Sequence, residues 1–242
     1  MRQCSAAQFP AELLKFQHSG ATGCNITLPL KGLAYELADD ISGAVKAVSA
    51  ANTILFANNS IYADNTDGKG WLTDLAKNSI KIKQQSVCLL GAGGAAAGLI
   101  AEIVNLQPAR LVVANRDTIK AERLLRATGK VEHRVLSLDQ LADDTALEFD
   151  LLINSTSLGH QGVMPSLPIG IFSPGAVFYD LNYGQAALPA QQWCAKNSIN
   201  YQDGLGMLVE QAALSFSIWT GKTPSTTAIL EELRVQLEQS QG

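Results

Sequence analysis

Two acidic residues stand three positions apart in the segment DNTDG, at Asp64 and Asp67. Asn, Asp and Gly are common in turns because they tolerate positive φ and hydrogen-bond to neighbouring backbone, so a plain turn is one interpretation. A lysine offers complementary chemistry: Lys31 follows NITLPL, where Pro29 ends strand pairing at the edge of a sheet. A protonated lysine can donate a proton, and a nearby carboxylate can orient it. The residues alone leave open an acid–base pair or a surface lysine beside a turn.

A second candidate segment is the glycine-rich stretch VCLLGAGGAAAG, between an expected strand and an expected helix. Glycines there permit a tight turn and the close approach of a pyrophosphate, whose charge then lies on the N–H groups that begin the helix. This context predicts a dinucleotide site; a structural turn or a site for an adenine-containing methyl donor are the alternatives. The candidate cofactor-binding residues are Gly91, Ala92, Gly93, Gly94 and Ala95, with Ala96 at the third fingerprint position.

The end of the following strand indicates which dinucleotide is bound. NAD enzymes usually carry an acid there to hold the ribose hydroxyls, but this chain has Asn115 and Arg116. An arginine suits a 2′-phosphate, which predicts NADP. Asp117 brings a carboxylate beside that phosphate, so NAD is kept as the alternative.

Other catalytic arrangements lack support in the sequence. None of the five tyrosines is followed by a lysine four places on, and His18, His133 and His160 stand apart from the expected site. The four cysteines are scattered, without a C-x-x-C pair or zinc-ligand spacing. We expect neither a metal site nor a disulfide framework.

Alternating strands and helices are expected to position these groups. From residue 86 onward, short apolar runs alternate with helical patterns, which predicts βαβ units and a doubly wound parallel sheet. The expected strands are 86–91, 109–116, 148–157 and 176–184, and the expected helices are 95–106 and 118–128.

The two ends of the chain have a different pattern, which predicts a smaller α/β lobe. Both a buried apolar helix closed by Gly221 and a last helix with Pro224 in its first turn are expected in the tail. The expected N-terminal elements are a helix over 11–20, a strand over 24–32, a helix over 32–45 and two strands within 51–68. The N-terminal residues therefore form a lobe separate from the doubly wound block.

Composition limits the kinds of molecule that the protein is expected to bind. The 242 residues are 47% hydrophobic, which suffices for a proper core, and the net charge of −4 argues against a nucleic-acid or anionic-membrane surface. No apolar run reaches the length of a membrane span, and the start lacks the apolar stretch of a signal peptide. We expect a cytoplasmic protein that acts on small molecules.

The chain resembles the shikimate dehydrogenases along nearly its whole length, through GCNITLPLK, AANT, DNTDG, GAGGAAAG, NR, NSTSLG and DGLGMLVEQAALSFSIWTG. The resemblance implies NADPH-dependent reduction of 3-dehydroshikimate to shikimate, in the chorismate pathway of aromatic amino-acid biosynthesis. A quinate/shikimate paralogue that prefers NAD and a truncated, non-catalytic dinucleotide-binding module are the alternatives.

The resemblance also implies that residues 1–70 and 207–242 form a substrate-binding and catalytic lobe, with an NADP-binding Rossmann-type domain of residues 71–206 inserted into it. It implies roles for individual residues as well. Lys31 and Asp67 match the catalytic pair, whereas Asp64 is left as turn chemistry. The implied substrate-binding residues are Asn25, Thr27, Asn52, Tyr183 and Gln211. The implied cofactor contacts, besides the glycine-rich segment and the following strand end, are Lys120, Thr156, Ser157, Gly204 and Met207.

Members of this family begin with a strand and a helix carrying a Ser-x-Ser pair that holds the substrate carboxylate. This chain opens at MRQCSAAQFP, which matches the segment after that unit. We expect the unit to be absent, which predicts normal NADP binding with feeble shikimate turnover. An uncovered sheet edge favours self-association, so a monomer or a homodimer is expected.

Overall fold

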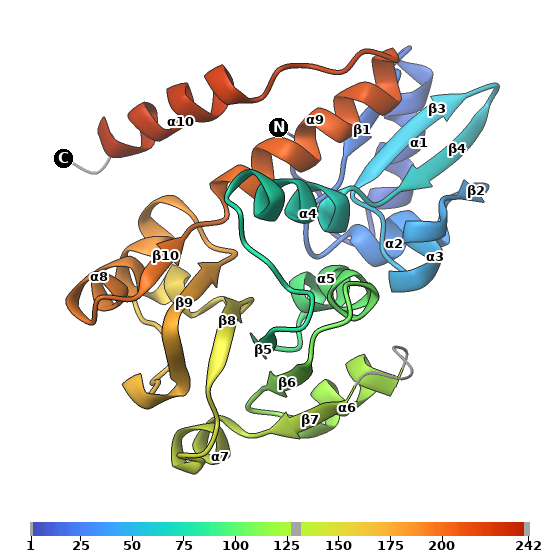
Figure 1. Ribbon diagram of the computed structural model, residues 1–242. Helices are drawn as coiled ribbons and strands as arrows, with labels where there is room; N and C mark the ends of the chain where they lie inside the picture. The colour runs from blue at the N-terminus through green and yellow to red at the C-terminus, as the bar shows by residue number, and fades with distance from the viewer. Residues whose placement is uncertain (1, 127–131, 240–242) are drawn as a thin grey trace.

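The computed structural model describes residues 2–126 and 132–239, which form two β-sheets flanked by helices (Figure 1). The larger sheet is parallel, with strand order β10-β9-β8-β5-β6-β7. The smaller sheet is mixed, with order β1-β3-β4-β2. The predicted fold class, a Rossmann-type parallel sheet joined to a smaller α/β lobe, is confirmed.

The larger sheet reverses its strand order at β5, which pairs with both β6 and β8. Its strands are β5 (Ser86–Leu90), β6 (Arg110–Ala114), β7 (His133–Leu136), β8 (Phe149–Asn154), β9 (Phe172–Asp180) and β10 (Asn200–Gln202). Side chains alternate across the sheet: Val87 and Leu89 pack toward helices α4 to α6, whereas Cys88 and Leu90 pack toward α7 and α8. Helices therefore cover both faces; the four that follow strands of this sheet are α5 (Gly94–Asn105), α6 (Thr118–Arg126), α7 (Leu138–Asp143) and α8 (Leu188–Lys196).

Sequence patterns missed part of this sheet. The short strands β7 and β10 and the helices α7 and α8 were not expected, because each is too short to show a clear period. The strand expected over 148–157 ends at Asn154, whose side chain accepts hydrogen bonds from Thr156. The strand expected over 176–184 instead spans β9, and positions 127–128 of the helix expected over 118–128 lie outside the described residues.

The smaller sheet contains the hairpin that the sequence predicts. Its strands β3 (Thr53–Ala57) and β4 (Ser60–Asp64) are joined by Asn58 and Asn59, both with positive φ, as a tight hairpin requires. The other strands are β1 (Gly23–Asn25) and β2 (Asp40–Ile41). Helix α1 (Phe9–His18) covers this sheet through Phe9 and Leu13.

Two expectations for this lobe are wrong. The strand expected over 24–32 ends at Asn25, and the helix expected over 32–45 is divided into α2 (Lys31–Glu36), strand β2 and α3 (Gly43–Val48). Side-chain hydrogen bonds explain the division. The Asp39 carboxylate accepts the Ile61 N–H at 2.8 Å, and the Ser42 hydroxyl accepts the Val45 N–H at 3.2 Å and so caps α3.

The C-terminal helices follow the prediction in part. Helix α9 (Leu205–Thr220) ends at Gly221, which has φ +69°, as expected. Most of its residues are buried or partly buried, as its apolar pattern predicts, and Ala212, Phe216 and Thr220 are the exposed ones. Helix α10 (Thr227–Gln239) ends where predicted but begins after Pro224 rather than around it. No described helix is both long and apolar enough to cross a membrane.

Helix α4 (Asp67–Lys77) connects the two sheets and lies beside α9 (Figure 1). Its Trp71 and Leu75 are buried in the core of the larger sheet. Its Asp74 is also buried and accepts the Tyr179 hydroxyl of β9 at 2.6 Å; burial raises the pKa of this carboxyl. Because α4 packs on both parts, the exact domain boundaries stay a prediction.

Candidate active site

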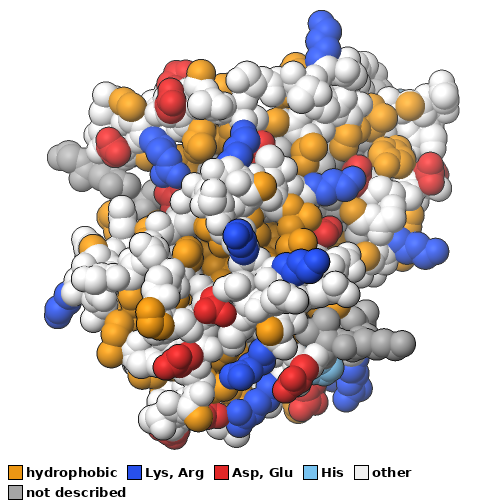
Figure 2. Space-filling model, viewed as in Figure 1, with side chains coloured by type: hydrophobic (Ala, Val, Ile, Leu, Met, Phe, Trp, Pro, Cys, Tyr) orange, Lys and Arg blue, Asp and Glu red, His pale blue; other side chains and the backbone are white. Residues whose placement is uncertain are grey.

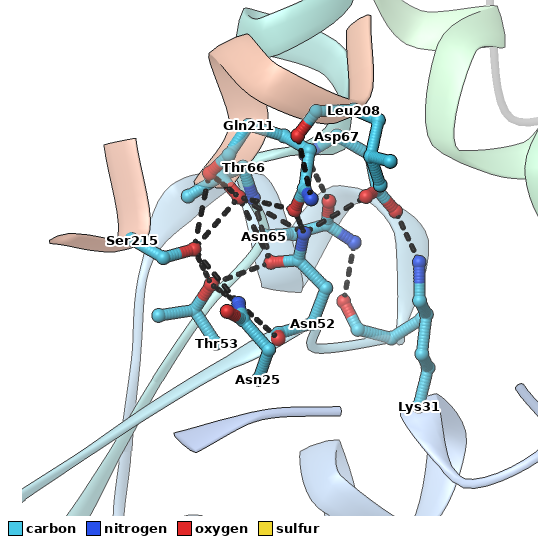
Figure 3. Close-up of polar contacts among 11 residues, drawn as sticks. Asn25, Lys31, Asn52, Thr53, Asn65, Thr66, Asp67, Leu208, Gln211 and Ser215 are labelled. Carbon is cyan, nitrogen blue, oxygen red and sulfur yellow. Dashed lines mark hydrogen bonds and ion pairs between the residues drawn. The ribbon is translucent and has the colours of Figure 1, made fainter. Parts of the chain in front are cut away.

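Lys31 and Asp67 form an ion pair, with Nζ and Oδ2 separated by 2.5 Å (Figure 3). Lys31 begins α2 after the turn that contains Pro29, and Asp67 begins α4 directly after β4. Their side chains are only 21% and 16% exposed. The pair is therefore partly shielded from water, which strengthens the interaction relative to a surface salt bridge.

Asn52 organises the other side of the Asp67 carboxylate. Its side chain is 2% exposed, and its Nδ2 lies 2.8 Å from Asp67 Oδ1, 2.9 Å from Gln211 Oε1 and 2.9 Å from Thr66 Oγ1 (Figure 3). The two hydrogens of this amide are shared among three acceptors. Because Lys31 holds one carboxylate oxygen and Asn52 the other, the plane of the carboxylate is fixed.

A buried polar network supports this arrangement from β3 and α9. Asn25 Nδ2 donates to Ser215 Oγ at 2.8 Å, and the hydroxyls of Ser215 and Thr53 lie 2.7 Å apart. Thr66 Oγ1 donates to the backbone oxygen of Gln211 at 3.0 Å. Sequence reasoning missed Thr53, Thr66 and Ser215, although all three lie inside motifs that had been singled out. Satisfied networks of this kind hold side chains rigidly.

The predicted substrate-binding and catalytic side chains line one cleft of about 820 Å³. Predicted residues in its lining are Asn25, Thr27, Lys31, Asn52, Asp67, Tyr183, Gly204, Met207 and Gln211. The rest of the lining is mostly apolar, with Phe9, Leu13 and Phe16 of α1 among it, and also includes Arg2 and Glu12. On the face of the molecule in Figure 2, hydrophobic side chains gather across the middle, with Lys and Arg side chains around them.

Asp64 takes a structural position, outside this lining. Its carboxylate accepts the Ser42 hydroxyl at 2.5 Å and the Asn65 N–H at 2.7 Å. These contacts tie the end of β4 to the start of α3. The division of DNTDG into one turn-forming acid and one cleft-lining acid therefore matches the geometry.

Three predicted ligand contacts come from the larger sheet and the start of α9. Tyr183 is 41% exposed, while Met207 belongs to the first turn of α9. Gly204 has no room for a side chain, since a β-carbon built there would lie 2.3 Å from the Leu181 carbonyl oxygen. These residues extend the cleft from the Lys31–Asp67 pair toward the larger sheet.

The glycine-rich segment forms the turn from β5 into α5 and fits a phosphate group. Gly91 has φ +98°, which favours glycine, and Gly93 precedes α5 without a side-chain cap. A β-carbon built on Gly93 would meet nothing within 4 Å, whereas one on Gly94 would lie 3.2 Å from Leu28 Cδ2, so there is open space at the residue that precedes the helix. Uncapped N–H groups at a helix start bind anions. Ala92 lies within the same turn and is buried.

The end of β6 presents the predicted 2′-phosphate residues. Arg116 is exposed, and its guanidinium makes no hydrogen bond or ion pair with any residue that the structure describes. Asp117 Oδ1 accepts the Lys120 N–H at 3.2 Å, and the Asp117 carbonyl accepts the Asn115 amide at 2.8 Å. The Asp117 carboxylate thus accepts a hydrogen bond from the first turn of α6, and the Arg116 side chain is left available to a ligand.

Thr156 and Ser157 follow β8 at the same sheet edge as the glycine-rich turn, since β8 is parallel to β5. The Thr156 hydroxyl donates to Asn154 Oδ1 at 2.7 Å, whereas Ser157 is exposed. Within residues 2–126 and 132–239, no group of three or more His, Cys, Asp or Glu side chains is placed to hold a metal ion. The Lys31–Asp67 pair and the glycine-rich turn are therefore the groups that could react with or bind a ligand here.

Comparison with known proteins identifies the family to which this chain belongs. Residues 2–54 match the family model described as shikimate dehydrogenase substrate binding domain, and residues 74–164 match shikimate/quinate 5-dehydrogenase. Residues 204–234 match the shikimate 5′-dehydrogenase C-terminal domain. The chain belongs to the shikimate dehydrogenase family.

Relatives of this shikimate dehydrogenase family member cover nearly all of it. The shikimate dehydrogenase (NADP(+)) of Acidovorax ebreus is 39% identical over 236 residues, which is 95% of this chain and 82% of the relative. That of Chromobacterium violaceum is 42% identical over 228 residues, or 91% of this chain and 81% of the relative. The structure of shikimate 5-dehydrogenase from Thermus thermophilus in complex with NADP(H) and shikimate has a TM-score of 0.80 at 27% identity, covering 96% of this chain and 85% of that one.

Proposed function

We propose that this chain catalyses the reversible, NADPH-dependent reduction of 3-dehydroshikimate to shikimate in aromatic amino-acid biosynthesis. The observation that carries the proposal is the Lys31–Asp67 ion pair in a cleft that also contains Gln211 and Tyr183. The names of the relatives support both the substrate and NADP.

The residues of the cleft suit a proton transfer that accompanies reduction of a ketone. NADPH, when bound, supplies the hydride that adds to the carbonyl carbon. Lys31 donates a proton from Nζ to the carbonyl oxygen as negative charge develops there, which yields the alcohol. Asp67 orients the Lys31 ammonium through the 2.5 Å contact, and Asn52 fixes the orientation of Asp67.

The remaining residues bind rather than react. The side chains of Asn25, Thr27, Tyr183 and Gln211 line the cleft and can hydrogen-bond the hydroxyls of the substrate. Gly91–Ala95 would hold the pyrophosphate and Arg116 the 2′-phosphate, with Gly204 and Met207 beside the nicotinamide. Lys120, Thr156 and Ser157 lie around the same edge of the larger sheet.

The test is a spectrophotometric assay of shikimate oxidation with NADP⁺ and, separately, with NAD⁺. We expect turnover with NADP⁺ and a higher Michaelis constant for NAD⁺. Quinate is assayed as a second substrate, because a paralogue would oxidise it as well. Binding of NADP⁺ without turnover of either substrate would refute the proposed function.

A further inference from the structure

Gly98, the last glycine of GAGGAAAG, lies in the interior of α5, beyond the turn that suits a phosphate. The facing helix α4 limits the size of the side chain that this position can accept. A β-carbon built on Gly98 would lie 3.8 Å from both Cβ and Oδ2 of Asp67.

A matching glycine stands on the other side of this contact. A β-carbon built on Gly68, the neighbour of Asp67, would lie 2.9 Å from Glu102 Cγ and 3.2 Å from the Gly98 carbonyl oxygen. Gly68 and Gly98 therefore let the first turn of α4 rest on the backbone of α5. Because neither glycine has a side chain, the two helices can approach each other closely at this point.

The same turn of α4 is also fixed from a second direction. A β-carbon built on Gly70 would lie 2.6 Å from the backbone nitrogen of Gln211 on α9. Asp67 thus begins a turn that is held between α5 and α9. Lys31 contacts its Oδ2 and Asn52 its Oδ1, and the Gly98 position faces its Cβ and Oδ2.

We propose that Gly98 is a positioning residue for the reaction. It leaves room for the Asp67 carboxylate against α5, and so sets the place of the Lys31–Asp67 pair relative to the cofactor turn that begins the same helix. This inference rests on the proposed function, because it assumes that the pair carries the proton-transfer step.

The distances define which side chains position 98 can accept. Alanine fits, because 3.8 Å is an ordinary van der Waals contact. Valine adds methyl groups about 1.5 Å beyond the β-carbon, within contact distance of the carboxylate. To avoid them, the Asp67 carboxylate has to shift away from α5, which disturbs its contacts with Lys31 and Asn52. A displacement of about 1 Å in a catalytic group can reduce a rate by up to about 100-fold.

The experiment compares Gly98→Ala with Gly98→Val. We expect alanine to keep kcat within about twofold, and valine to lower kcat by about 10- to 100-fold while the Kd for NADP⁺, from fluorescence titration, stays within about twofold. In an Asp67→Asn background, Gly98→Val should cause no further loss, because its effect acts through Asp67. Unchanged kcat in Gly98→Val, or an equal loss in both backgrounds, would overturn the inference.

A crystal structure of Gly98→Val gives a readout that is independent of turnover. We expect the Asp67 carboxylate to shift away from α5, so that the distance between Lys31 Nζ and Asp67 Oδ2 differs from the 2.5 Å of the unaltered chain, and an unchanged distance contradicts the inference. If the unaltered chain shows no shikimate turnover, the proposed function fails, and this distance still decides whether Gly98 positions Asp67.

A second pair of variants applies if Gly98→Val does not fold. Gly68→Ala directs a methyl group at Glu102 Cγ, so kcat should fall by about tenfold. Adding Glu102→Ala removes the nearest obstructing atoms, though not the Gly98 carbonyl oxygen at 3.2 Å, and should restore part of the rate, whereas Glu102→Ala alone should leave it nearly unchanged. Failure of the double variant to recover would mean that packing between α4 and α5 does not set the position of Asp67.

Discussion

The side-chain amide of Asn52 lies 2.8 Å from Asp67 Oδ1, on the carboxylate oxygen that Lys31 does not contact. Asn52 is buried and also lies 2.9 Å from Gln211 Oε1. It therefore connects the acid of the ion pair to a residue expected to bind substrate. This relationship makes Asn52 an organiser of the site as well as part of the cleft lining.

Asn52→Asp is predicted to reduce kcat by about tenfold or more. The change keeps the size of the side chain but replaces a donor with a carboxylate facing Asp67, and two like charges at that distance oppose each other. Asn58→Asp, at the exposed tip of the hairpin, adds the same charge far from the cleft and should leave kcat unchanged. Steady-state kinetics measure kcat for the two variants, and an equal kcat in both would contradict the prediction.

Lys31→Ala is predicted to lower kcat by roughly 100-fold or more, because the proton donor to the developing alkoxide is lost. Affinity for NADP⁺ should change little, since Lys31 is proposed to donate a proton to the substrate and not to hold the cofactor. Stopped-flow and binding measurements separate the two quantities. Lys46→Ala, on the exposed surface of α3, removes the same charge and serves as the control.

Asp67→Asn is predicted to be severe for kcat, and Asp64→Asn mild. The first loses the charge that orients Lys31, whereas the second alters hydrogen bonds to Ser42 and Asn65. Asp64→Asn should instead lower the unfolding midpoint slightly, because it weakens two charge-assisted hydrogen bonds. Kinetics and thermal unfolding of both variants test this division, which is wrong if the two kcat values fall equally.

Arg116→Ala is predicted to raise the Michaelis constant for NADP⁺ by about 10- to 100-fold, the equivalent of one charge-assisted phosphate contact. The constant for NAD⁺ should change less than twofold, because NAD⁺ lacks the 2′-phosphate. Arg110→Ala, at the opposite end of β6, is the matched control. If the unaltered chain already uses NAD⁺ better than NADP⁺, the interpretation of the β6 end is wrong.

Asp180→Asn is predicted to flatten the pH dependence of stability in the acid range. Burial raises the pKa of Asp180 to about 6, outweighing hydrogen bonds from Asn182 and Asn154. An unfolded aspartate titrates near ~3.9, so between about pH 4 and 6 the folded protein holds a proton that the unfolded chain has lost. The contribution of Asp180 to stability therefore falls as pH rises through that window.

The expected difference between the unaltered chain and Asp180→Asn is on the order of 1 to 3 kcal/mol across that window. Urea unfolding at a series of pH values measures it. Asp143→Asn, which alters an exposed carboxylate on α7, should leave the slope unchanged. Parallel stability curves for the unaltered chain and Asp180→Asn would refute the prediction.

Local patterns predicted much of the fold, because they act over a few residues. The β5–turn–α5 unit and the Asn58–Asn59 hairpin follow from strand, glycine and turn chemistry within short windows. The division between α2 and α3 could not be predicted in this way, since it depends on Asp39 meeting Ile61 of another strand.

The candidate site shows the same limit. Lys31 and the two acids of DNTDG can be selected as candidates from their residue types, but only the resemblance to a family assigns the catalytic role to Asp67 and not to Asp64. The supporting network was missed because its partners are remote in sequence: Thr53 and Ser215, whose hydroxyls meet, are 162 positions apart. A pattern of residues within a short segment carries no information about such a long-range contact.

The contact between Asn52 and Gln211 also joins residues far apart, 159 positions along the chain. During synthesis the ribosome therefore releases the whole larger sheet before α9 can reach α4. Domains generally fold as units as the chain emerges. The larger sheet can thus be complete while the smaller lobe still lacks α9, so a nascent chain forms its glycine-rich turn before Gln211 can complete the cleft.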